Sequence, residues 1–168
     1  MTVIEAIIYT LTQRAWVDRA DPTVYRWARH LTYPEVGRHD KVRAIVAEVR
    51  RQFRFPAGVD PATAETLSSA RHLLDAGRAV DADDACLLLA TAAMSVGIPC
   101  RFVAARYRHS WTCWVAYQVG ERWQVVDPLL PPPTPEIPGE PWEWPLPERK
   151  PDETVWGPPP WSSFEDRQ

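Results

Sequence analysis

The side chains of this 168-residue chain that could act as nucleophiles or bases are three cysteines and four histidines. Cys86 lies within an apolar run, where a cysteine usually serves as a small hydrophobic residue. Cys100 opens an expected strand and Cys113 lies within another. None of these residues has the spacing of zinc ligands, so we expect no metal, and we expect no cofactor. An odd number of irregularly spaced cysteines also argues against a disulfide framework.

The acidic turn Asp81-Ala82-Asp83-Asp84 opens the most informative segment of the chain. Asp81 fits the N-cap of a helix, and the two aspartates after Ala82 fit its first turn, where negative charge is favourable. The run that follows to Ser95 is apolar around most of its circumference, which predicts a helix buried at the centre of the domain. These carboxylates therefore need no catalytic role.

Three strands are expected after this helix, at residues 100–106, 111–119 and 122–126. Gly120-Glu121 predicts a tight hairpin between the second and the third. The pair Asp127-Pro128 then ends the last strand. One antiparallel sheet against a central helix, with further helices in front, is an α+β architecture.

The segment from Gly77 to Pro128 resembles the transglutaminase-like branch of the papain-type cysteine enzymes, including small members encoded by phages and prophages. Members of this family carry a Gly-Asp-Cys-Asp-Asp turn that opens a helix, a histidine on the next strands, and an Asp-Pro pair that ends a strand. The resemblance implies a papain-like α+β fold. It also implies the chemistry of a cysteine protease or an acyl-transferase.

The family's chemistry needs a thiolate at a helix N-terminus, where backbone N–H groups and the helix dipole lower the pKa of the thiol. It also needs an imidazole as base and a carboxylate that orients the imidazole. The position that matches the nucleophile is Ala82, whose methyl group cannot attack a carbonyl. Asp127 matches the orienting acid, although Asp-Pro after a strand is also a common start of a turn.

Two residues could match the family's histidine. Counting back from Asp127 with the usual hairpin length gives Thr112, and both catalytic side chains are then absent. Alternatively, His109-Ser110-Trp111 resembles the family's His-Ala-Trp signature with a hairpin three residues longer, and only the nucleophile is then missing. Ala82 is either a natural loss or an engineered replacement, and both interpretations stay open.

Four helices are expected before the acidic turn, and Gly77 is expected to end the fourth as a left-handed cap. The polar face of the third helix holds four arginines, which form either a solvated face or a site for an anion or partner. The helices are expected at residues 3–17, from Asp21-Pro22 to before Pro34, at about 40–53 and at 66–76, and the arginines are Arg43, Arg50, Arg51 and Arg54.

Thirteen of the eighteen prolines lie between Pro128 and Pro160, so the chain divides into a domain at 1–128 and an extended tail at 129–168. The tail holds 3 basic and 8 acidic residues, against 16 and 14 before it. It packs on its own domain, lies along another protein through its tryptophans, or stays disordered. These tryptophans are Trp142, Trp144, Trp156 and Trp161.

A net charge of -3 gives no electrostatic case for nucleic acid as the main partner. The sequence has no apolar run of about 18 residues and no signal-peptide pattern, so we expect no membrane association. The expected location is the cytoplasm or an assembled virion.

Together these features predict a catalytically inactive transglutaminase-like domain that serves as a binding or structural module for protein partners. The resemblance to the phage-encoded members implies a virion or head–tail assembly protein. The alternative is a cysteine protease or acyl-transferase whose nucleophile has been replaced by Ala82.

Overall fold

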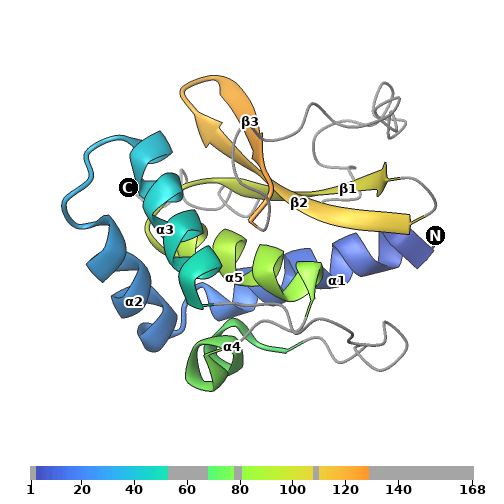
Figure 1. Ribbon diagram of the computed structural model, residues 1–168, viewed down its shortest axis with the longest axis horizontal. Coiled ribbons are helices and arrows are strands. Elements are labelled where there is room, and N and C mark those ends of the chain that lie inside the picture. Colours follow the sequence, from blue (N-terminus) through green and yellow to red (C-terminus); the bar gives the residue numbers. More distant parts are fainter. Residues whose placement is uncertain (1–2, 53–67, 78–80, 108–109, 129–168) are drawn as a thin grey trace, which may run out of the picture.

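The computed structural model describes residues 3–52, 68–77, 81–107 and 110–128. Within this part of the chain, five helices lie on one side of a three-stranded sheet, and three of them contact it (Figure 1). The helices are α1 (Val3–Asp18), α2 (Pro22–Thr32), α3 (Arg38–Gln52), α4 (Ala70–Ala76) and α5 (Ala82–Ser95), and the strands are β1 (Cys100–Tyr107), β2 (Ser110–Val119) and β3 (Arg122–Val126). The predicted α+β class is confirmed.

The sheet is antiparallel, with the strand order β1-β2-β3. Trp114 of β2 pairs with Val103 of β1, and Val115 pairs with Val126 of β3. Gly120 has a φ of 59° in the turn between β2 and β3, a conformation that glycine adopts without strain. All three strands begin and end within one residue of the positions that the sequence predicts.

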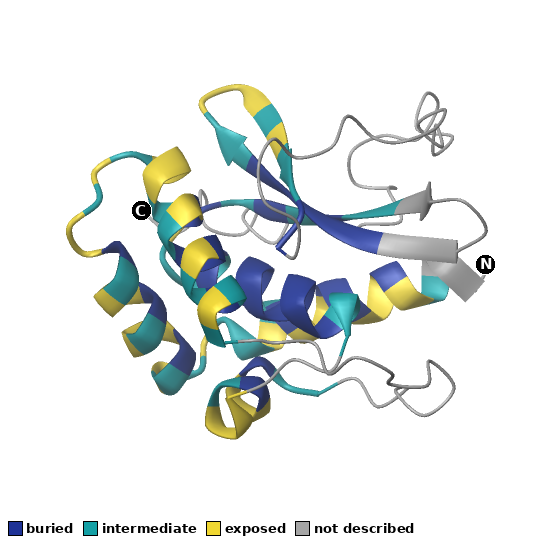
Figure 2. Ribbon diagram, in the orientation of Figure 1, coloured by how far each residue is buried: buried dark blue, intermediate teal, exposed yellow. Residues whose placement is uncertain are grey.

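Helix α5 forms the centre of the domain. Every residue from Asp84 to Ala93 is buried, and the helix contacts all four other helices as well as β1 and β2 (Figure 2). A helix that is apolar on all sides can be stable only when neighbours cover its whole circumference, and these elements do so. The predicted central helix is therefore confirmed.

Helix α4 begins later than the sequence predicts, because Ser68 and Ser69 lie outside it. The side chain of Ser69 accepts a hydrogen bond from the His72 N–H at 3.1 Å, and serine is a strong N-cap residue. The Ala70 N–H donates to Asp18 Oδ2 at 2.8 Å, so the start of α4 is hydrogen-bonded to the end of α1. The expected C-terminal cap is present, since Gly77 has a φ of 63°.

None of the helices in the described ranges is both long and apolar enough to cross a membrane.

Candidate functional site

Ala82 is the first residue of α5, directly after the N-cap Asp81. The Asp81 carboxylate accepts a hydrogen bond from the Asp84 N–H at 2.9 Å. The remaining N–H groups of this first turn and the positive end of the helix dipole would stabilise a thiolate at position 82. The helix start has the geometry of a thiol site, and Ala82 supplies no thiol.

Asp127 follows β3 and is only 6% exposed. Its Oδ2 accepts a hydrogen bond from the Trp114 Nε1–H at 2.8 Å, across the β2–β3 pair. The Arg50 guanidinium of α3 donates to the main-chain oxygen of Asp127 at 2.8 Å and to that of Pro128 at 3.2 Å. Both the side chain and the backbone of Asp127 are thus held by other elements.

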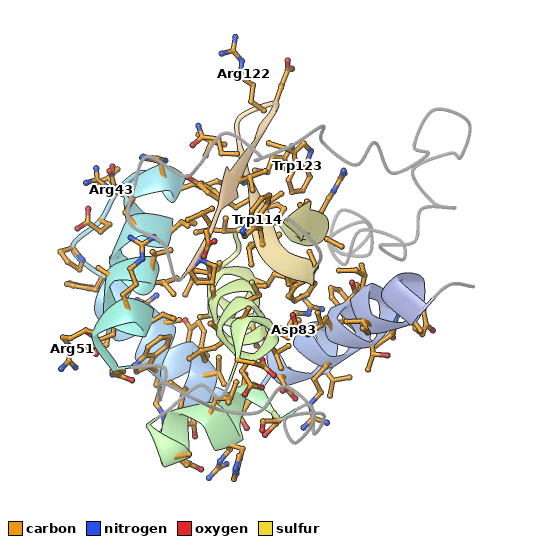
Figure 3. The ribbon with its side chains drawn as sticks, turned by 45° about the vertical axis from the view of Figure 1, so that its right-hand side comes forward. Arg43, Arg51, Asp83, Trp114, Arg122 and Trp123 are labelled. Carbon is orange, nitrogen blue, oxygen red and sulfur yellow. The ribbon has the colours of Figure 1, made fainter. Side chains whose placement is uncertain are left out.

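Helix α5 and the end of β3 both contact β2, through the hydrogen bond of Cys86 to Cys113 and that of Asp127 with Trp114. Burial raises the pKa of the Cys86 thiol well above its usual value, and a hydrogen bond with Cys113 and the charges of Asp83 and Asp127 raise it further. Figure 3 shows Asp83 on α5 and Trp114 on the sheet above it.

The acidic turn changes the electrostatics of the helix start. Burial raises the pKa of Asp83 to about 6, and the neighbouring charges of Asp81 and Asp84 add to this effect. Close carboxylates disfavour one another's ionisation and would also disfavour a thiolate. The helix dipole and the acidic turn therefore act in opposite directions at position 82.

The three native cysteines are buried within the domain. The Cys86 Sγ–H donates to the Cys113 main-chain oxygen at 3.0 Å. Burial raises the pKa of Cys100 as well as that of Cys86. Because a nucleophilic cysteine is accessible and has a lowered pKa, these thiols have the properties of packing residues.

Thr112 lies in β2 opposite Ala105, two residues before Trp114. His109, the alternative to Thr112, lies outside the described residues. So do the four tail tryptophans, Trp142, Trp144, Trp156 and Trp161.

A second polar cluster lies where α3 approaches the β2–β3 hairpin. His39 Nδ1 is 2.8 Å from the Tyr117 hydroxyl oxygen, and that hydroxyl donates to Gln124 Oε1 at 3.0 Å. Tyr117 and Gln124 are a cross-strand pair, so the hairpin register could have placed them together. The contact with His39 depends on how α3 packs, and no local sequence signal indicates it.

Arg50 is a further residue that sequence reasoning missed. The sequence predicts only that Arg50 belongs to an arginine face, which is either solvated or a binding site. Instead it is partly buried, and its guanidinium ties α3 to the end of β3. Arg43 and Arg51 are exposed, as a solvated face would have them, and Arg54 lies outside the described residues.

A central helix that packs against an antiparallel sheet, with further helices around it, defines a domain of the papain-like α+β class. Residues 25–128 match the model of the transglutaminase-like superfamily. This match covers more than half of the chain, and the chain belongs to that superfamily.

Two crystal structures share the fold. A putative protease from Parabacteroides distasonis is 19% identical with a TM-score of 0.59, and the match covers 73% of this chain and 26% of that one. A putative cysteine protease from Cytophaga hutchinsonii is 16% identical with a TM-score of 0.52, covering 63% of this chain and 36% of that one. The chain thus spans about a quarter and about a third of these two proteins. No curated protein matches it.

Proposed function

We propose that this chain is a catalytically inactive member of the transglutaminase-like superfamily that serves as a binding or structural module. Ala82 carries the proposal. It occupies the first position of α5, where the family's chemistry needs a thiolate, and a methyl group can neither ionise nor form an acyl intermediate. The domain keeps its buried helix and its sheet, so the scaffold persists without the reactive group.

The residues around Ala82 support the proposal. Each remaining thiol is buried, which removes the ordinary substitutes for the nucleophile. The bond between Trp114 and Asp127 supports the register in which Trp114 is the tryptophan of the His-Ala-Trp signature. Thr112 then takes the place of the histidine, and the base is lost together with the nucleophile.

We further propose that the module binds protein partners through its proline-rich tail. Tryptophan side chains give a large contact area at a low cost in conformational entropy, and they are enriched in protein interfaces. The tail contributes Trp142, Trp144, Trp156 and Trp161. Resemblance to the small phage-encoded members supports a role in a virion or in head–tail assembly.

An assay of amide hydrolysis and of amine incorporation into glutamine peptides tests the loss of activity. The native chain should give no turnover above that of buffer, and Cys86→Ala should leave this background unchanged. Turnover by the native chain that Cys86→Ala abolishes would reveal an active thiol and would refute the proposal.

One observation favours the alternative of a cysteine protease or acyl-transferase whose nucleophile was replaced. Asp127 is still buried and its carboxylate is still bonded, as an orienting acid would be. A cysteine codon at position 82 of the natural gene would establish this alternative. So would an Ala82→Cys variant that turns over amide substrates without further changes.

A further inference from the structure

A groove of about 710 Å³ lies between α3 and the β2–β3 hairpin. Four valines give it an apolar wall, and the His39–Tyr117–Gln124 cluster lies at it. The valines are Val42, Val46, Val125 and Val126. Among the described strands, β3 pairs only with β2, so its outer edge has no described partner strand. A groove beside a strand edge, with an apolar wall and a few polar groups, suits an extended peptide.

The chain leaves the domain at this groove. Arg50 lines the groove, and the same guanidinium holds the main-chain oxygens of Asp127 and Pro128. The 40 residues from 129 to 168 therefore start beside Arg50. They need no long connection to reach the rest of the groove.

The first part of the tail is chemically complementary to this surface. Residues 129–135 read Leu-Leu-Pro-Pro-Pro-Thr-Pro, which is uncharged and favours an extended polyproline conformation. The first acidic residue after them is Glu136. Helix α3 carries five basic and two acidic residues, whereas the tail carries three and eight. Glu35 and Asp40 line the groove together with Arg43 and offset its positive charge. We therefore expect apolar contacts with the valines, rather than charge, to be the main attraction for the tail.

The lengths also agree. Arg50 and His39 are eleven residues apart on α3, which is about 16 Å along the helix axis. At about 3.1 Å per residue, residues 129–135 extend over about 20 Å. We propose that residues 129–135 of this chain bind along the groove between α3 and β3, from Arg50 towards His39. The tryptophans, which begin at Trp142, then lie beyond the groove and are left for a partner.

Disulfide trapping in the full-length chain tests this placement. Pro132→Cys is combined with Ala44→Cys, which lines the groove about 9 Å along α3 from Arg50, or with Arg51→Cys, which is exposed on the same helix and close to the chain exit. A tail that does not bind the groove would reach position 51 at least as readily as position 44. A bound tail should form the intrachain disulfide with position 44 about tenfold faster, because binding raises its effective concentration there. The native thiols are buried and do not compete.

The outcomes separate three arrangements. Faster intrachain trapping at position 44 supports the proposal. Equal or faster trapping at position 51 overturns it, because the tail then samples the surface without preference. A disulfide-linked dimer also overturns it and assigns the groove to a second copy of the chain.

Discussion

The first turn of α5 combines a methyl group with three carboxylates, those of Asp81, Asp83 and Asp84. The carboxylates cap the helix and complement its dipole, which stabilises the helix start. Asp83 is half-buried beside the other two, and partial burial together with their charges raises its pKa to about 6. Asp83 therefore lowers the unfolding free energy of the domain by an amount that depends on pH.

Asp83→Asn should stabilise the domain at neutral pH by about 3 kcal/mol, because the Asp83 carboxyl, whose pKa is raised to about 6, is ionised there at a cost. Since the folded-state pKa lies above the unfolded value, the favourable contribution of Asp83 is complete below pH 4 and is lost as the pH rises through about 6. Denaturant unfolding between pH 4 and pH 7 measures this. Asp75→Asn, which changes an exposed carboxylate, serves as the control. A variant with the same pH dependence as the native chain would contradict the prediction.

Trp114→Phe should destabilise the domain by about 1–3 kcal/mol, because it leaves a buried carboxylate oxygen of Asp127 without its indole donor. Thermal or denaturant unfolding gives the difference. Trp27→Phe is the matched control, since Trp27 is partly buried and its indole has no hydrogen bond to another described residue. Equal losses from the two substitutions would mean that only packing is affected at position 114.

At the scale of elements, Arg50 connects α3 to the end of β3. Arg50→Ala should cost about 1.5–3 kcal/mol of unfolding free energy, because two main-chain oxygens lose a charged donor. The amide of Val126 should also exchange faster with solvent. Arg51→Ala, in the next position of the same helix, removes only an exposed pair with Glu48 and should leave stability nearly unchanged. Similar effects from both variants would show that the contact with β3 contributes nothing.

The elements themselves could largely be predicted from the sequence, because local patterns determine them. The apolar circumference of α5 and the glycine turn at 120 specify the central helix and the hairpin. The start of α4 could not be predicted in this way. Ser69 caps the helix, and the Ala70 N–H donates to Asp18, which lies 52 residues earlier in the chain. Long-range contacts of this kind leave no local pattern.

The candidate site divides in the same way. The acidic turn and Asp127 could be found because they stand at the ends of predicted elements. The donor to Asp127 from Trp114, the clamp from Arg50 and the contact of His39 with Tyr117 depend on how separate elements pack. Position 112 is located by the strand register, while position 109 stays a prediction.

At the scale of the molecule, the chain shares its fold with segments of much larger proteins. The match covers 26% of the Parabacteroides distasonis protein and 36% of the Cytophaga hutchinsonii protein. The part that matches the transglutaminase-like family, residues 25–128, contains the central helix α5 and the sheet. A scaffold of this size has a core of its own and is suited to reuse for binding.

Replacing the four tail tryptophans by alanine should leave the unfolding free energy of the domain within about 0.5 kcal/mol, as expected for positions outside a core. The same variant should lose the protein partners that crosslink to the native chain in its host. The substitutions are Trp142→Ala, Trp144→Ala, Trp156→Ala and Trp161→Ala. A large loss of stability with unchanged crosslinking would place these side chains on their own domain.

The most direct test of the lost nucleophile is alkylation by iodoacetamide under native conditions, read by mass spectrometry. The native chain should stay unmodified at its three buried cysteines, whereas Ala82→Cys should take up one equivalent at position 82, because this position is partly exposed and lies at a helix N-terminus. Rapid modification of Cys86, Cys100 or Cys113 in the native chain would reveal a reactive thiol. That result, or a folded Ala82→Cys variant that does not react, would contradict the proposed site.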